Sequence, residues 1–166
     1  MIIVLHGMNG NGLESTTCKS IKEYFSGENV ICPTYDSSKS HSEIANYLES
    51  FVENVLSSSN EELIFIGCSM GGYWARYLAN KFTADKLIML NPSLELYEEG
   101  IKKDSPSLPI AVFLGMKDEV VDPQIALEIY KNRAYIVSYP NGDHRLHKEL
   151  VYILPDIEKL INTYIQ

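Results

Sequence analysis

A serine flanked by glycines lies near the middle of this sequence, directly after an apolar run. Residues 67–72 read Gly-Cys-Ser-Met-Gly-Gly; they follow the run Leu-Ile-Phe-Ile at 63–66 and precede a stretch with helical spacing. A serine at the apex of a strand–turn–helix connection adopts strained backbone geometry, and glycine neighbours let the strand and the helix approach closely enough. Such a turn exposes the hydroxyl, so the pattern predicts that Ser69 is a nucleophile.

Two later loops contain the groups that could activate this serine. A serine hydroxyl is a poor nucleophile until an imidazole accepts its proton, and a carboxylate must orient that imidazole and stabilise its charged form. Residues 115–123 contain Asp118, and residues 139–144 end on His144. The order Ser, Asp, His along the chain differs from the orders of trypsin-like and subtilisin-like enzymes. We therefore predict a triad of Ser69, Asp118 and His144.

Four carboxylates in these two loops are candidates to pair with His144. Asp143 is adjacent to the histidine in sequence, and neighbouring side chains on an extended loop diverge. Asp122 precedes a proline at the head of a predicted helix, which makes it a natural N-cap. Of the remaining two, Asp118 and Glu119, the sequence favours Asp118, because it follows a glycine turn that can direct it toward the next loop.

The loop at residues 6–12 is polar and rich in glycine, and it follows the first predicted strand. We expect the backbone N–H groups of Met8 and Met70 to stabilise an oxyanion beside the serine. The loop lacks the lysine and hydroxyl of a phosphate-binding loop and the glycine spacing of a dinucleotide site, so nucleotide binding is not expected. His6 is expected to form structural hydrogen bonds, since another histidine is already assigned as the base.

Other reactive side chains have simpler interpretations. Cys68 precedes Ser69 on a strand, where adjacent side chains alternate, so its thiol should be buried. His147 lies three residues after His144, a spacing compatible with a metal, but no third ligand accompanies the pair. We expect His41 to begin a helix at the surface. A group of apolar residues either forms the wall of an acyl pocket or packs as an ordinary loop: Leu94, Leu96, Tyr97 and Ile101.

Short β-branched runs alternate with longer amphipathic stretches along the chain, which is typical of a parallel α/β sheet. Strands are predicted at residues 2–5, 30–31, 63–66, 86–90, 110–114 and 134–138. Helices are predicted around residues 14–25, 41–56, 70–81, 123–130 and 146–165. In such a sheet the loops that follow the strands meet at one edge, so the three triad residues should converge there.

The composition limits the classes of protein to which this chain can belong. Its 166 residues suit one domain, expected to span residues 1–166. A net charge of −8 and a pI near 5.0 argue against a nucleic-acid partner, and no apolar run is long enough for a membrane segment. Three cysteines without CxxC spacing favour free thiols and a cytoplasmic location. The oligomeric state is left open.

These motifs together resemble a minimal α/β-hydrolase, similar to a small bacterial esterase family with an N-terminal H-G loop and a G-x-S-M-G-G elbow. The resemblance covers nearly the whole chain: residues 6–7 resemble the start of the oxyanion loop, 67–72 the elbow, 115–121 the acid loop and 142–144 the histidine loop. It implies a compact α/β-hydrolase fold with a mainly parallel sheet of about six strands and helices on both faces. Residues 91–109 leave no room for a lid domain.

The expected function is that of a serine hydrolase which cleaves a carboxylic ester, with a thioester as the second choice, through an acyl-enzyme. The expected substrate is a small-molecule ester, and neither a metal nor an organic cofactor is required. Two alternatives stay open at this point. One alternative is a non-catalytic binding protein that keeps the fold, and the other is a serine peptidase or amidase that differs in its leaving group.

Overall fold

The computed structural model describes residues 1–96 and 103–163. Within these residues six strands form one sheet, in the order β2-β1-β3-β4-β5-β6, and every neighbouring pair is parallel. The strands are β1 (Ile2–Leu5), β2 (Val30–Ile31), β3 (Ile64–Cys68), β4 (Lys86–Leu90), β5 (Ile110–Gly115) and β6 (Tyr135–Tyr139). Every residue of β1, β4 and β5 is buried, as expected for strands covered on both faces.

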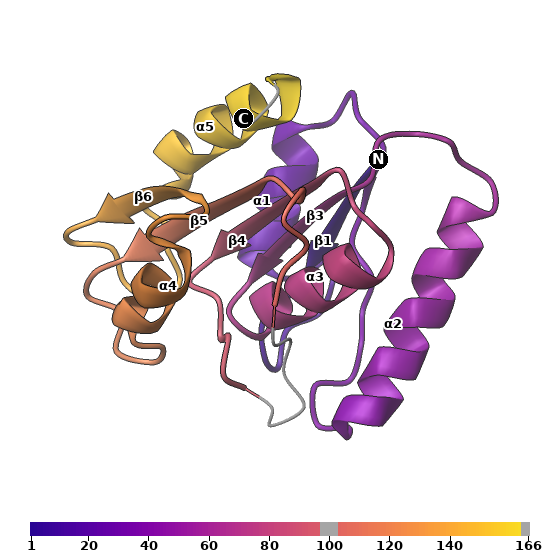
Figure 1. Cartoon of the computed structure of the whole chain (residues 1–166), viewed down its shortest axis with the longest axis horizontal. Coiled ribbons are helices and arrows are strands. Elements are labelled where there is room, and N and C mark those ends of the chain that lie inside the picture. The colour runs from indigo at the N-terminus through magenta and orange to yellow at the C-terminus, as the bar shows by residue number, and fades with distance from the viewer. Residues whose placement is uncertain (97–102, 164–166) are drawn as a thin grey trace.

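Helices cover both faces of this sheet (Figure 1). The helices are α1 (Thr16–Tyr24), α2 (His41–Leu56), α3 (Met70–Lys81), α4 (Pro123–Tyr130) and α5 (Leu150–Asn162). Successive residues of β1 point to opposite faces, so Ile2 and Val4 join the apolar core under α1 and α5. Ile3 and Leu5 join the second core, under α2, α3 and α4. The predicted parallel α/β sheet with helices on both faces is confirmed.

The predicted and observed elements differ mainly at the last helix. Its predicted start was residue 146, but α5 begins at Leu150 because Leu146 has a positive φ of 52°, which a right-handed helix does not allow. The predicted end at residue 165 lies outside the described residues. The bounds of α2, α3 and α4 agree with the prediction. None of the helices within the described residues is long and apolar enough to cross a bilayer.

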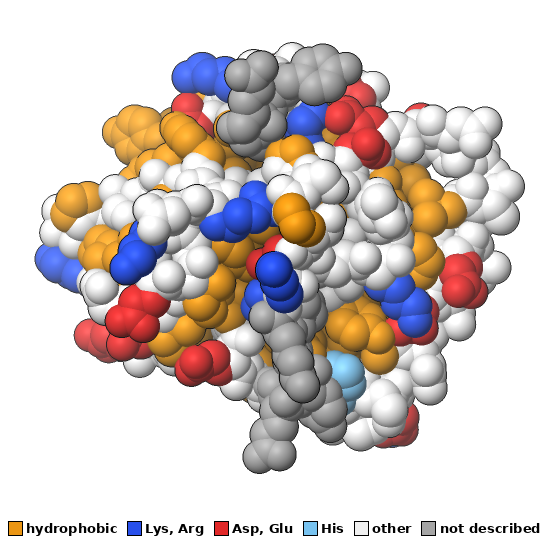
Figure 2. Space-filling view, viewed as in Figure 1, with side chains coloured by type: hydrophobic (Ala, Val, Ile, Leu, Met, Phe, Trp, Pro, Cys, Tyr) orange, Lys and Arg blue, Asp and Glu red, His pale blue; other side chains and the backbone are white. Residues whose placement is uncertain are grey.

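The strand register brings the loops that concern function to one level. Leu5 pairs with Gly67, Cys68 with Leu90, and Gly115 with Tyr139, so the carboxyl ends of neighbouring strands lie side by side. The loops after β1, β3, β4, β5 and β6 therefore start from the same edge of the sheet. On the face shown in Figure 2, acidic and basic side chains are interspersed, without one large basic patch.

Candidate active site

The connection between β3 and α3 has the strained geometry that the sequence predicts. Ser69 has φ 54° and ψ −122°, a region that residues with a side chain rarely adopt. Its backbone N–H donates to the carbonyl of Leu90 on β4 at 3.0 Å, and its own carbonyl accepts from Gly72 and Ser93. Backbone hydrogen bonds on both sides therefore hold the serine at the apex of the turn.

Two glycines make this tight turn possible. A Cβ at Gly67 would lie 2.1 Å from the carbonyl oxygen of Gly71. A Cβ at Gly71 would lie 2.1 Å from the carbonyl oxygen of Leu5, at the end of β1. No side chain fits at either position, since real Cβ atoms do not approach backbone oxygens so closely. The first helical turn of α3 can thus pack directly against the ends of β1 and β3.

Three loops bring Ser69, His144 and Asp118 into one chain of hydrogen bonds. The Oγ of Ser69 lies 3.0 Å from Nε2 of His144, and Nδ1 of His144 lies 2.8 Å from Oδ2 of Asp118. The side chain of Asp118 is 1% exposed and that of His144 is 21% exposed. An ionised carboxylate only accepts hydrogen bonds, so Nδ1 carries the proton and Nε2 is free to accept from the Ser69 hydroxyl.

The second oxygen of the Asp118 carboxylate is fixed by its own loop. Its Oδ1 accepts from the backbone N–H groups of Val120 and Val121, at 2.8 and 2.9 Å. With one oxygen held by the loop, the other stays aimed at the imidazole of His144. The carboxylate is thus oriented from both sides.

The other carboxylates of these loops are engaged elsewhere or exposed. Asp122 caps α4 by accepting from the backbone N–H of Gln124 at 2.9 Å, as the sequence predicts. Asp143 accepts from the backbone N–H groups of Arg145 and Leu146 and does not bond to the neighbouring imidazole. Glu119 is exposed.

A cleft of about 670 Å³ surrounds Ser69 and His144. Met8 and Met70, whose backbone N–H groups are predicted to hold an oxyanion, both line it. Ser93 also lines it, with its Oγ 3.5 Å from that of Ser69. The rest of the lining is mixed in polarity and includes Asn9, Asn11, Glu14, Thr16, Thr17, Leu96, Val120, Val121, Arg145 and His147.

His6 is a buried structural residue at the end of β1. Its Nδ1 bonds to the carbonyl of Gly7 at 2.8 Å, and its Nε2 accepts from the backbone N–H of Tyr35 at 3.3 Å. These partners require a neutral ring protonated on Nδ1, and burial lowers the pKa of His6. The rings of His6 and Tyr35 stack with centroids 4.0 Å apart, and the Tyr35 hydroxyl donates to the His6 carbonyl. The expected structural role is confirmed.

The lowered pKa of His6 predicts a loss of stability in mild acid. The folded chain resists protonation that the unfolded chain accepts, so the free energy of unfolding should fall as pH drops below the ordinary value of 6.5. The carboxylates with lowered pKa, such as Glu43 and Glu49, lose their contribution only below about 4.5, so the two effects separate. Denaturant unfolding between pH 7 and 5 should show a shallower pH slope in His6→Gln; equal slopes would contradict this assignment.

One other expectation needs correction, and one holds. His41 begins α2 as predicted but is not a free surface residue: it is partly buried, its Nε2 bonds to the Tyr73 hydroxyl at 2.8 Å, and its ring contacts those of Trp74 and Tyr77. The packing of α2 against α3 covers part of its ring. Cys68 as a residue is partly buried and lines the cleft, but it packs against the core under α1 and α5, and burial of its thiol raises the pKa, as the predicted buried thiol requires.

The remaining candidates have limited roles in the described structure. His147 is exposed at the cleft, and within residues 1–96 and 103–163 no group of three His, Cys, Asp or Glu side chains is arranged to hold a metal ion. Leu94 packs into the core, whereas Leu96 lines the cleft. Tyr97 and Ile101 lie outside the described residues.

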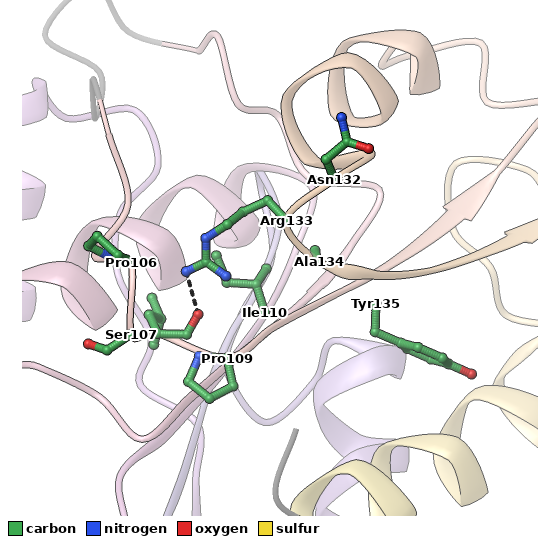
Figure 3. A pocket seen from close by; sticks show the side chains of 9 residues that line it. Pro106, Ser107, Pro109, Ile110, Asn132, Arg133, Ala134 and Tyr135 are labelled. Atoms are coloured by element: carbon green, nitrogen blue, oxygen red, sulfur yellow. Dashed lines mark hydrogen bonds between the residues drawn. The ribbon is translucent and has the colours of Figure 1, made fainter. Parts of the chain in front are cut away.

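A second hollow, of about 470 Å³, lies where the chain enters β5 and β6, at the opposite edge of the sheet (Figure 3). Arg133 lines this hollow. Its guanidinium donates to the carbonyls of Ser105 and Leu108, each at 2.6 Å, and so holds the loop before β5. No histidine or carboxylate is among the described residues that line it. Of these two hollows, the cleft around Ser69 is the one lined by histidines.

Sequence reasoning missed two residues of this region, Asn91 and Ser93. Both follow β4 directly, at the edge where the other functional loops begin. Their position after a buried strand was the available signal, because polar residues at that edge face the same site.

Comparison with solved structures shows the α/β-hydrolase fold. A Xanthomonas campestris protein named as a hydrolase of the alpha/beta superfamily aligns with a TM-score of 0.81 at 15% identity over 97% of both chains. An esterase from Pyrococcus furiosus aligns with a TM-score of 0.78 at 13% identity, over 99% of this chain and 83% of the esterase. A Xanthomonas campestris serine hydrolase described as lacking a lid aligns with a TM-score of 0.67 at 16% identity, over 95% of this chain and 79% of that hydrolase.

Comparison at the level of sequence gives one family. Among curated proteins, none matches the sequence. A family model matches residues 1–105, which include the elbow with Ser69 but neither Asp118 nor His144. The match covers well over half of the 166 residues, and the chain belongs to the Uncharacterised protein family UPF0227.

Proposed function

We propose that this protein is a serine hydrolase that cleaves a carboxylic ester, or a thioester, through an acyl-enzyme. The observation that carries the proposal is the continuous hydrogen-bond relay from Ser69 Oγ through His144 to the buried carboxylate of Asp118. The strained backbone of Ser69 supports it, because strain at a polar residue that lines a cleft is a feature of functional sites. In this proposal the protein is one domain over residues 1–166 and acts in the cytoplasm on a small-molecule ester.

The first step of the proposed mechanism forms the acyl-enzyme. The Oγ of Ser69 attacks the ester carbonyl carbon while Nε2 of His144 takes the hydroxyl proton, and Asp118 stabilises the resulting imidazolium. The developing oxyanion is held by the backbone N–H groups of Met8 and Met70. The Met70 N–H lies in the first turn of α3, where backbone donors lack intrahelical partners and the helix dipole favours negative charge. The imidazolium then gives its proton to the leaving alkoxide.

The second step releases the acid. A water molecule attacks the acyl carbonyl as neutral His144 takes one of its protons, and the imidazolium returns that proton to Ser69 Oγ as the bond to the acyl group breaks. Neither step needs a metal or an organic cofactor. The structural neighbours are compatible with ester chemistry, since they include the Pyrococcus furiosus esterase and a structure of Est1E from Butyrivibrio proteoclasticus with ferulic acid bound.

A graded panel of substrates tests this function. We expect hydrolysis of short acyl esters, with rates that fall as the acyl chain lengthens, because only residues 91–109 join β4 to β5 and leave little chain to cover a long acyl group. The panel should also contain thioesters and amides of the same acyl groups. Cleavage of amides alone would indicate a peptidase or amidase, and turnover of no substrate would indicate a binding protein; either result would contradict the proposal.

A further inference from the structure

Asn91 follows β4 directly and is buried beside the candidate active site. It is 2% exposed, and its φ is 42°, in the left-handed region that asparagine tolerates better than most residues. Its backbone N–H donates to the carbonyl of Phe113 on β5 at 2.9 Å. The main chain therefore fixes the point from which the Asn91 side chain extends.

The side-chain amide of Asn91 joins two loops. Its Oδ1 accepts from the backbone N–H of Gly115 at 2.8 Å. Its Nδ2 donates to the carbonyl of Asp143 at 2.9 Å and to that of His144 at 3.0 Å. Both donor hydrogens and the acceptor oxygen of the amide are thus used, and every partner is a backbone group.

These partners belong to the loops that carry the acid and the base. Gly115 opens the loop of Asp118, and the Asp118 N–H donates back to the Gly115 carbonyl at 3.2 Å. His144 is held through its own carbonyl. On the other side, the Ser69 N–H is bonded to Leu90, the residue before Asn91. Within the described residues, Asn91 is thus bonded to both loops and adjacent to the residue that anchors the serine.

We propose that Asn91 is a positioning residue that sets the imidazole of His144 between Ser69 and Asp118. The two loops also bond to each other directly, since the N–H of Lys117 donates to the carbonyl of Gly142 at 2.9 Å. That bond joins the loops after β5 and β6 to each other, whereas the Asn91 amide ties them to β4 and hence to the serine. Removing the Asn91 amide should let the His144 backbone, whose carbonyl the amide holds, shift relative to both Ser69 and Asp118. The kinetic part of this inference rests on the proposed function.

Two substitutions at Asn91 separate the amide from the backbone. Asn91→Gly removes the side chain and tolerates the positive φ. Asn91→Asp keeps the shape but turns an acceptor oxygen toward the carbonyls of Asp143 and His144. The matched control is Asn80→Ala, because Asn80 on α3 also forms three side-chain hydrogen bonds, to Arg76, Asp104 and Ser105, in a part of the fold without triad residues.

The test measures ester hydrolysis, denaturant unfolding and the proton NMR signal of the His144 Nδ1–H hydrogen bond to Asp118. We expect kcat of Asn91→Gly to fall on the order of 10²-fold with KM unchanged, which is the effect of a misplacement of about 1 Å. The Nδ1–H signal should broaden or shift in both Asn91 variants. Asn80→Ala should lower stability alone, with kcat and the signal unchanged.

The NMR signal keeps this inference separate from the proposed function. If the wild-type protein hydrolyses no ester, the proposed function fails, but a signal altered in the Asn91 variants and not in Asn80→Ala still supports positioning. A wild-type signal and a kcat within about twofold of wild type in folded Asn91→Gly would overturn the proposal. If Asn91→Gly does not fold, Asn91→Asp carries the comparison. If neither Asn91 variant folds, Asn91 is needed for stability, and that result would also overturn the positioning proposal.

Discussion

Ser69→Ala should abolish ester hydrolysis without unfolding the protein. Loss of the nucleophile in a triad enzyme lowers kcat on the order of 10⁶-fold, since no other group forms the acyl intermediate. The hydroxyl contributes little to packing: its contacts are with His144 at 3.0 Å and Ser93 at 3.5 Å. Alanine keeps the φ of 54° at the same strain, so the melting temperature should change little.

Ser69→Gly is the matched variant, because glycine adopts a positive φ without strain. It should be as inactive as Ser69→Ala, with a melting temperature equal to or above that of the alanine variant. Both should be assayed with a short acyl ester after purification, with circular dichroism as the check on folding. Retention of more than a few per cent of wild-type kcat in either variant would show that Ser69 is not the nucleophile.

Asp118→Asn should lower kcat by roughly 10² to 10⁴, at or below the loss known for a triad carboxylate changed to an amide. An amide can still accept from Val120 and Val121 through its oxygen, which turns its NH₂ group toward Nδ1 of His144. Nδ1 must then accept a hydrogen bond, so the neutral ring carries its proton on Nε2 and cannot take the serine proton. The position of the His144 imidazole is therefore kept, but its proton lies on the nitrogen that must accept from Ser69.

Asp122→Asn provides the control from the same loop. Asparagine is nearly as good an N-cap as aspartate, so the change should cost about 1 kcal/mol or less of stability and leave kcat unaffected. Both variants should be compared with wild type in kcat and melting temperature. A large kinetic loss in Asp122→Asn together with a small one in Asp118→Asn would mean that the acid of this loop is misassigned.

The parts of the structure that were predictable from sequence depend on local patterns. The alternation of apolar strands and amphipathic helices fixes which loops share an edge, and the glycines at 67 and 71 permit only one kind of turn around Ser69. These inferences bring the loops of Asp118 and His144 to the serine, and the N-cap position of Asp122 leaves Asp118 as the favoured acid. The structure then places the three side chains within hydrogen-bonding distance.

The parts that were missed depend on contacts between distant segments. The position of Asn91 after β4 places it at the functional edge, but the two carbonyls to which it donates lie 52 and 53 residues later, so the sequence does not reveal these partners. His41 was assigned to the surface because only the packing of α2 against α3 brings it to Tyr73, 32 residues away. The positive φ of Leu146, which delays the start of α5, likewise opposes the helical spacing of the sequence.

Covalent labelling with an organophosphonate tests most directly whether Ser69 is a nucleophile activated by His144. The reagent phosphonylates an activated serine, and peptide mass spectrometry then locates the adduct. In the wild-type protein we expect a single adduct on Ser69, formed far more slowly in a folded His144→Ala variant because no base takes the hydroxyl proton. A wild-type protein without an adduct on Ser69, or one labelled at the same rate as His144→Ala, would contradict the proposed mechanism.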